Sequence, residues 1–308
     1  MCSISQSKYI SQPEWKVLEE LKGLVKRELN YVEKVNWKAD FAVSIENNHV
    51  SALSLYDYML STLPGSIKEF KQLKHLFLMK NQLKEFPIEI TQMYFLNSLY
   101  LRENQLVKIP ESIGNLTQLK ELDLGRNQLV KIPESIGNLT QLEKFSLGEN
   151  QLVEIPESIG NLTQLEEFSL GENQLIEIPE SIGNLTQVKD FNLDRNQLEE
   201  VPASIGNLKS LKFLRLSDNN LTEIPKSIGN LRSLEYLTLS INKLRLIPET
   251  LRNLTNLKEI WITGNPLVKY PYALNELPNL KYIKIGSKLN QIFESEFNEL
   301  RAKGVQEY

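Results

Sequence analysis

The chain has 308 residues, 41% of them hydrophobic and 24% charged, and its 35 basic and 39 acidic side chains give a net charge of −4. This composition excludes a disordered or collagen-like chain, and no stretch approaches the ~18 consecutive apolar residues of a membrane-spanning helix. The net negative charge argues against a broadly basic surface that would bind nucleic acid. With one cysteine, Cys2, and two histidines, we expect no disulfide, no metal site and no cofactor.

Residues 1–49 predict an N-terminal cap. Met1–Trp15 lacks the basic-then-apolar run of a secretory signal, so we expect a cytoplasmic protein. Ser11 and Glu14, with Pro13 between them, form a helix-start pattern. Apolar residues then recur at helical spacing, at Trp15, Leu18, Leu21, Val25 and Leu29. Residues 41–45 alternate like a strand, and residues 47–49 could turn it antiparallel to the first strand of the repeats that follow.

Two residue types then recur every 23 positions. The asparagines are Asn81, Asn104, Asn127, Asn150, Asn173, Asn196, Asn219, Asn242 and Asn265. The prolines run from Pro64 to Pro271 in the same rhythm, and the first apolar residue of each unit runs from Val50 to Leu280. This predicts about eleven 23-residue repeats and an array over residues 50–285.

Each position of the repeat has a physical reason. The x-L-x-L piece predicts a short strand, so that in one unit Leu122 and Leu124 point inward while Glu121 and Asp123 point outward. The asparagine amide both donates and accepts, so it can satisfy turn groups that are cut off from water. The x-Pro step favours extended backbone. The Gly-Asn pair suits a sharp bend.

Residues 286–308 predict a C-terminal cap. Phe293, Phe297 and Leu300 form an apolar stripe on a short helix, Gly304 fits its C-terminal stop, and Val305 follows. A single repeat cannot bury its own leucines, so an array of this kind needs covering at both ends.

The repeat unit resembles the leucine-rich repeat superfamily, over about residues 50–302. Its 23-residue form with an Ile-Pro or Leu-Pro step is similar to the intracellular Ras-suppressor and scribble type. The resemblance implies an α/β solenoid, a leucine-rich repeat horseshoe with a parallel sheet on its concave face, closed by helical or hairpin caps at both ends. That face commonly binds proteins, and some relatives are scaffolds in small-GTPase signalling.

The outward strand positions are the candidate partner-binding residues, because aromatic and arginine side chains are the usual anchors of protein interfaces. The C-terminal repeats carry Phe213, Arg215, Tyr236, Trp261, Tyr282 and Lys284. The N-terminal repeats carry His75, Phe77 and Tyr100. The middle repeats carry an acidic floor that includes Glu121, Asp123, Glu167 and Asp190, which would steer a basic patch of a partner.

A second interpretation of these residues needs no partner. Aromatic side chains on neighbouring strands can pack on one another across the sheet, and the caps can cover both ends of the concave face. The middle repeats are almost copies of one another, so duplication alone can explain their charge.

These observations favour a non-catalytic, monomeric protein-binding scaffold or adaptor in intracellular signalling or assembly. The alternative, a regulator or adaptor of a small GTPase, rests on the resemblance alone. An enzyme is less favoured, because an open sheet offers no pocket that would shift a pKa. Nucleic-acid binding is disfavoured by the charge, although the C-terminal aromatic and basic residues leave room for single strands.

Overall fold

The computed structural model describes residues 10–36 and 39–307, and the chain divides into two compact units at Asn150 and Gln151. We call the N-terminal one unit 1 and the other unit 2. Cys2 and the first part of Met1–Trp15 lie outside the described residues. The boundary falls inside the expected array, and the division into 1–49, 50–285 and 286–308 stays a prediction.

The described strands of unit 1 lie side by side in chain order, and all adjacent pairs are parallel except β2 with β3. They follow helix α1 (Gln12–Val25). The strands are β1 (Asn30–Tyr31), β2 (Ala42–Glu46), β3 (His49–Ser54), β4 (His75–Phe77), β5 (Ser98–Tyr100), β6 (Glu121–Asp123) and β7 (Lys144–Ser146).

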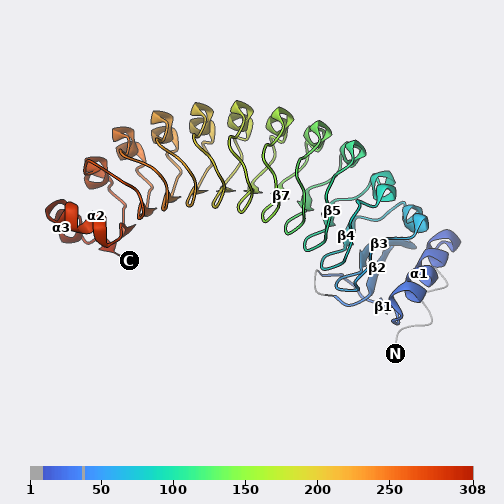
Figure 1. The fold of residues 1–308 in the computed structure, drawn as a ribbon. Coiled ribbons are helices and arrows are strands. Elements are labelled where there is room, and N and C mark those ends of the chain that lie inside the picture. The colour runs from blue at the N-terminus through green and yellow to red at the C-terminus, as the bar shows by residue number, and fades with distance from the viewer. Residues whose placement is uncertain (1–9, 37–38, 308) are drawn as a thin grey trace. The chain divides into compact units, whose positions relative to one another are not determined.

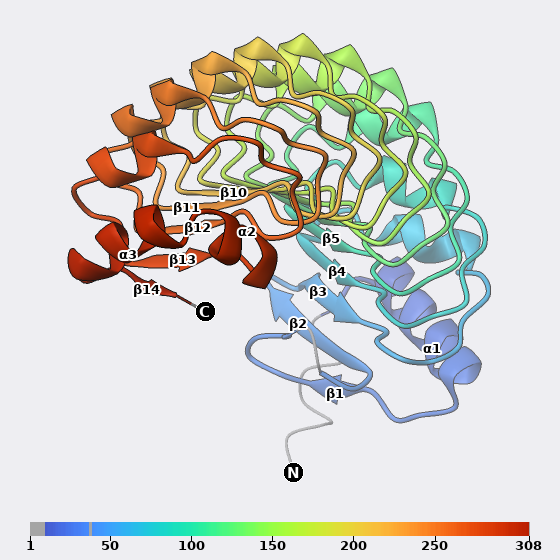
Figure 2. The same ribbon diagram turned by 60° about the vertical axis from the view of Figure 1, so that its left-hand side comes forward.

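The strands of unit 2 are parallel and also follow chain order. They are β8 (Glu167–Ser169), β9 (Asp190–Asn192), β10 (Phe213–Arg215), β11 (Tyr236–Thr238), β12 (Glu259–Trp261), β13 (Tyr282–Lys284) and β14 (Gln306–Glu307). Helices α2 (Ser287–Ile292) and α3 (Glu294–Ala302) lie between β13 and β14, and Figure 2 shows them beside these strands.

Each strand from β3 to β12 is followed by a return segment that holds a short 3-10 helix. In both units the strands line one side of the coils and the 3-10 helices line the other (Figure 1). In unit 1 these helices are η1 (Gly65–Glu69), η2 (Ile88–Gln92), η3 (Glu111–Asn115) and η4 (Glu134–Asn138). In unit 2 they are η5 (Glu157–Asn161), η6 (Glu180–Asn184), η7 (Ala203–Asn207), η8 (Lys226–Asn230), η9 (Glu249–Asn253) and η10 (Tyr272–Glu276). The predicted α/β solenoid with a parallel sheet is confirmed.

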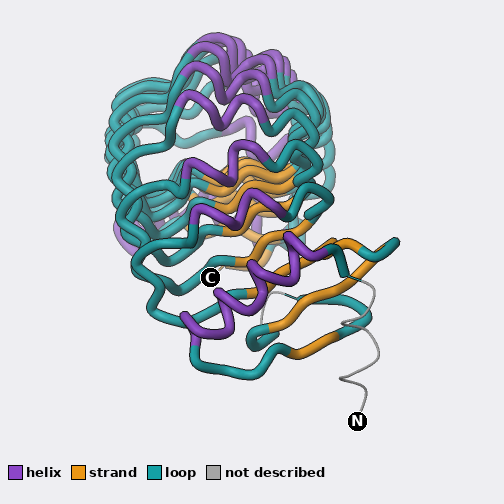
Figure 3. Tube along the Cα trace, turned by 90° about the vertical axis from the view of Figure 1, so that its right-hand side faces the viewer, coloured by secondary structure: helices purple, strands orange, loops and turns teal. Residues whose placement is uncertain are grey.

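The N-terminal cap is a helix and a hairpin (Figure 3). Helix α1 begins at Gln12, as the sequence predicts, but Ser11 makes no side-chain cap bond. Glu14 is buried instead and accepts from the backbone N–H of Val50 at 3.4 Å, while its other oxygen lies 3.3 Å from His49 Nδ1. The predicted helix start is thus confirmed, while Glu14 turns away from its own helix to hold the hairpin.

The predicted hairpin is confirmed. Strands β2 and β3 pair antiparallel, with Glu46 opposite His49. Between them Asn47 and Asn48 have φ angles of 49° and 67°. Asparagine tolerates this left-handed backbone better than most residues, because its short side chain can hydrogen-bond locally.

The C-terminal cap contains more than the predicted helix. The apolar stripe divides between two helices, with Phe293 at their junction and Phe297 buried on α3. Tyr270 packs edge-on against both rings, with centroids 5.9 and 5.0 Å away. Gly304, at φ 88°, ends the helix as expected. The chain then forms β14, which pairs with β13 and was not predicted.

The recurring asparagines, which we call the asparagine ladder, bond backbone groups of the turns as predicted. Asn196 shows how they do so. Its Oδ1 accepts from the N–H of Leu175 at 3.0 Å. Its Nδ2 donates to the carbonyl oxygens of Leu170 and Leu193 at 3.0 and 3.1 Å. One buried amide thus bonds backbone groups of two successive coils in an interior that is shielded from water.

The repeated glycine does a different job from the one expected. Gly183 lies within the 3-10 helix η6 and has no left-handed backbone, so it is not needed for a sharp bend. A Cβ atom at this position would lie 2.8 Å from the carbonyl oxygen of Ser204 in the next coil. The glycine therefore allows the close approach of neighbouring coils.

Candidate protein-binding face

The candidate site is the outward side of strands β10 to β13 in unit 2. In each three-residue strand the middle residue is buried, and the first and third face the other way. This places six of the predicted residues on one surface, which we call the aromatic face: Phe213, Arg215, Tyr236, Trp261, Tyr282 and Lys284.

Aromatic rings and cations alternate across the aromatic face. The rings of Phe213 and Tyr236 stack with centroids 4.7 Å apart and planes 11° apart. The guanidinium of Arg215 lies 5.9 Å from the Phe213 ring, and Lys284 Nζ lies 4.7 Å from the Trp261 ring. The residues thus pack on one another, as the interpretation without a partner requires, yet each is still partly exposed.

Two carboxylates hold this arrangement in place. Asp190 forms a two-point ion pair with Arg215, with N–O distances of 2.5 and 3.3 Å. Glu259 accepts from Trp261 Nε1 at 2.6 Å. A side chain that is already held in one rotamer loses less conformational entropy on binding, so these contacts lower the entropy cost of any binding at the aromatic face.

The acidic floor is not the open negative surface that was expected. In unit 1, Glu149 pairs with Arg126 at 2.7 Å and with Arg102 at 3.0 Å. Although partial burial works in the opposite direction, the hydrogen bond from Arg126 and the charge of both arginines lower the pKa of Glu149. In unit 2, Glu172 pairs with Arg195 at 3.1 Å. Much of this floor is therefore neutralised by neighbouring cations.

Of the other predicted floor residues, Glu121, Asp123 and Asp190 are hydrogen-bonded to neighbouring groups, and Glu167 is exposed. Glu121 accepts from the Tyr100 hydroxyl. Asp123 accepts from the backbone N–H of Gly125 at 3.0 Å, and burial raises its pKa. Asp190 is the partner of Arg215 described above, and Glu167 is exposed on β8. Steering of a basic partner by this floor stays a prediction.

The predicted residues of the N-terminal repeats, His75, Phe77 and Tyr100, form a cluster that is buried or half-buried beside the N-terminal cap. Phe77 is only 7% exposed and packs in a small core with Val35, Ala42 and Ala52, so its assignment as an exposed contact residue is wrong. Tyr100 stacks on Phe77 at 4.9 Å. His75 is half-buried, and its Nδ1 lies 3.1 Å from Ser98 Oγ. Burial lowers the pKa of His75.

A cavity of about 630 Å³ adjoins this cluster on unit 1. It is lined by Tyr56, Met79, Lys80, Tyr100, Arg102, Glu103 and Asp123. Its cations are already engaged, because Arg102 pairs with Glu149 and Lys80 Nζ lies 5.3 Å over the Tyr56 ring. Tyr100 and Asp123 of this lining are among the predicted partner-binding residues.

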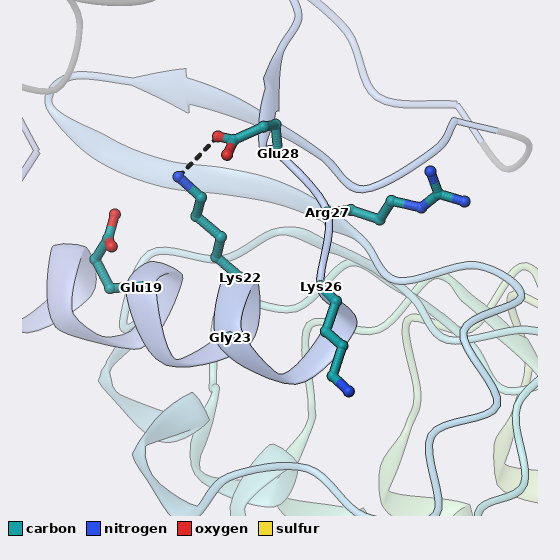
Figure 4. A pocket seen from close by; sticks show the side chains of 6 residues that line it. All are labelled: Glu19, Lys22, Gly23, Lys26, Arg27 and Glu28. Carbon is teal, nitrogen blue, oxygen red and sulfur yellow. Dashed lines mark ion pairs between the residues drawn. The ribbon is translucent and has the colours of Figure 1, made fainter.

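Another group of charged side chains lies at the C-terminal end of α1 and in the residues that follow it (Figure 4). Lys22 pairs with Glu28 at 2.7 Å, and Lys26 and Arg27 are exposed beside them. The cavity they border, about 620 Å³, is lined only by residues 19–28. Because no second element walls it, it is a weaker candidate than the aromatic face.

The described part of the chain contains no cluster of three or more His, Cys, Asp or Glu side chains able to hold a metal ion. Nor does any helix within the described ranges have the length and apolar character needed to cross a membrane.

A family model described as "Leucine-rich repeat region" matches residues 49–171 and 177–302. The chain belongs to the leucine-rich repeat family. A second model, "Leucine Rich Repeat", matches residues 164–185. Leucine-rich repeat proteins generally bind other proteins. Membership of the 23-residue intracellular type stays a prediction.

Solved leucine-rich repeat structures resemble this chain. One is the ectodomain of the plant membrane receptor kinase GASSHO1/SCHENGEN3 from Arabidopsis thaliana in complex with Casparian strip integrity factor 2 (32% identity, TM-score 0.74, 82% of this chain and 32% of that chain). Another is the plant peptide hormone receptor RGFR1 in complex with RGF2 (28% identity, TM-score 0.64, 84% and 46%). InlJ from Listeria monocytogenes, at 22% identity and a TM-score of 0.65, shares the fold (77% and 48%).

This leucine-rich repeat chain spans between a third and a half of the length of these three solved chains. A comparison with curated proteins gave no match.

Proposed function

We propose that this protein is a non-catalytic binding scaffold whose aromatic face holds another protein. The observation that carries the proposal is the exposed, pre-organised set of stacked rings and cations on β10 to β13. Aromatic and arginine side chains in such settings supply most of the binding energy in protein interfaces. The plant receptor structures support the proposal, since both were solved in complex with a named partner.

The test is an affinity capture from native lysate with the wild-type chain and a Tyr236→Ala/Trp261→Ala variant. Removing both rings should reduce the captured partner by about tenfold or more, because each anchor contributes about 1 kcal/mol or more. The control is Tyr94→Ala/Phe95→Ala, which removes two rings that are 57% and 54% exposed on the return side of unit 1. Equal capture by wild type and the Tyr236/Trp261 variant, or equal loss from the control, would contradict the proposal.

A small-GTPase partner, a cytoplasmic location and a monomeric state are further predictions, and each has its own test. A small-GTPase partner would be captured differently with GDP and with a non-hydrolysable GTP analogue bound. A cytoplasmic location would be seen by fractionating cells that express the tagged chain. Monomeric behaviour would be measured by light scattering.

A further inference from the structure

Charge is divided sharply along the sequence of unit 2. Residues 151–200 carry two basic and eleven acidic side chains, whereas residues 201–290 carry thirteen basic and six acidic ones. The second range includes all four strands of the aromatic face. Because an excess of one charge attracts the opposite charge from solution, the coils that carry the aromatic face favour an acidic partner over a basic one.

Three lysines on the aromatic face or at its border have no acidic partner of their own. Lys212 and Lys281 are exposed directly before β10 and β13, and Lys284 is partly exposed at the end of β13. Within the described residues, none of the three has a carboxylate within ion-pair distance. Lys258, in the equivalent position before β12, pairs with Glu235 at 2.5 Å. The three lysines are therefore the cations that carboxylates of a partner can pair with.

Repulsion of an acidic partner by the aromatic face itself is small. Glu259 is the one acidic side chain among the first and third residues of strands β10 to β13, which also include Arg215 and Lys284. The carboxylate of Glu259 is already hydrogen-bonded, because it accepts from Trp261 Nε1 at 2.6 Å. The outward positions of the four strands thus have no excess of negative charge.

The packing of the rings favours a polypeptide over the bases of a nucleic acid. A base stacks on an open ring face. Phe213 and Tyr236 each cover a face of the other, with centroids 4.7 Å apart, and Lys284 Nζ lies 4.7 Å over the Trp261 ring. Three of the four rings therefore have one face occupied already. Carboxylates that pair with the lysines, and apolar groups that contact ring edges, suit this surface better than stacked bases.

The spacing of the tyrosines indicates the conformation of a segment that crosses the strands. Tyr236, Glu259 and Tyr282 are in register on neighbouring strands. Since adjacent strands are ~4.8 Å apart, the backbone positions of the two tyrosines lie about 9.6 Å apart across the sheet. A polyproline II helix has three residues per turn and a rise of ~3.1 Å, so equivalent side chains recur every ~9.3 Å. Every third residue of such a segment can therefore contact a tyrosine.

We propose that the aromatic face binds an acidic, proline-rich segment of its partner in the polyproline II conformation. The segment crosses β11 to β13, with prolines against Tyr236 and Tyr282 and carboxylates opposite Lys281 and Lys284. The inference rests on the proposed function and adds the chemistry of the partner. A proline-rich segment suits this role because it is extended before it binds and loses little conformational entropy.

The binding test uses blocked synthetic peptides and NMR of the full isotope-labelled chain. Three repeats of Glu-Pro-Pro should shift the indole N–H signal of Trp261 to saturation. A version with Lys in place of Glu should bind at least about fivefold more weakly, because it meets like charge. A version with Gly in place of Pro keeps the charge but is flexible, and it should also bind about fivefold more weakly. Equal binding of either version, or no shift of the Trp261 signal, would overturn the inference.

The variant test removes one positive charge at two places. Lys284→Gln should weaken binding of the Glu-Pro-Pro peptide about fivefold and make it less sensitive to salt. The control is Lys226→Gln, which removes the same charge from an exposed position on η8, on the return side of unit 2. It should change the affinity by less than about twofold. Unchanged binding by Lys284→Gln, or an equal loss in both variants, would contradict the inference.

The two proposals can fail separately. If the Glu-Pro-Pro peptide does not bind while the Tyr236→Ala/Trp261→Ala variant loses its partner from lysate, the acidic segment is wrong and the proposed function stands. If that variant captures its partner undiminished, the proposed function falls. If oligo(dT) shifts the Trp261 indole signal at lower concentration than the peptide does, the inference is overturned in favour of a nucleic acid.

Discussion

Asparagine 196 shows how much of this fold depends on single polar side chains. Its amide accepts from the N–H of Leu175 and donates to three carbonyl oxygens, two of them buried. A buried backbone group without a partner costs about 1–3 kcal/mol. Each of the two buried carbonyl oxygens is shared with the asparagine of a neighbouring coil, whereas the N–H of Leu175 is bonded by Asn196.

We expect Asn196→Ala to lower the free energy of unfolding by about 1–3 kcal/mol, because the buried N–H of Leu175 loses its partner. The carbonyl oxygens of Leu170 and Leu193 keep the amides of Asn173 and Asn219. Urea denaturation followed by circular dichroism measures this decrease. The neighbouring Gln197 is exposed, so Gln197→Ala should change the value by less than about 0.5 kcal/mol. A similar small effect for Asn196→Ala would contradict the role of the ladder.

Asp194 gives a prediction about pH. Burial raises the pKa of its carboxyl above the ordinary value of 3.8, despite hydrogen bonds from Ser217 N–H and Thr238 Oγ1. Between the two pKa values the folded state binds more protons than the unfolded state, so this group's contribution to stability falls as the pH rises through that range.

Asp194→Asn should therefore raise the unfolding midpoint at pH 7, and the gain should shrink as the pH falls below the raised pKa. Thermal unfolding from pH 3.5 to 7 measures it, with Asp218→Asn as the exposed control. A gain that grows toward acid would show that the sign is wrong.

At the scale of elements, Glu14 joins α1 to the β2–β3 hairpin through its contacts with His49 and the Val50 N–H. We expect Glu14→Ala to destabilise the N-terminal cap by about 1–2 kcal/mol, because it leaves these groups unsatisfied. Hydrogen exchange of the α1 and hairpin amides should accelerate, while amides of β10 to β12 should be unaffected. Glu19, exposed on the same helix, is the control position.

The elements also divide into those that the sequence predicts and those that it does not. The strands, the proline-led return segments and the asparagine ladder follow from a pattern that recurs in every coil. Val35 covering Phe77, and strand β14, occur once each. A contact made by a single segment has no repetition to reveal it. The sequence therefore indicated that a cap could cover this end of the face, but not that Val35 would cover Phe77.

The aromatic face was predictable residue by residue, because strand alternation alone decides which side chains point outward. Its ion pairs were not, since Asp190 and Arg215 belong to different coils and pair diagonally rather than in register.

At the scale of the whole molecule, charge predicts weak binding to polyanions. The net charge is −4, and several of the cations, including Arg195 and Arg215, already pair with carboxylates. Because polyanion binding depends on free cations that displace counterions, we expect elution from heparin resin below about 0.2 M NaCl. Retention to higher salt that disappears in a Lys284→Ala/Lys288→Ala variant would instead support nucleic-acid binding.

The asparagine ladder has a consequence for how such a chain can change over generations. Asn127 and Asn196 both accept from the residue 21 positions earlier and donate to the one 26 positions earlier. A bond that always reaches the same distance back does not depend on how many coils come before it. Whole coils can be duplicated or lost by recombination without breaking the ladder, so the recognition surface can lengthen or shorten in steps of one strand.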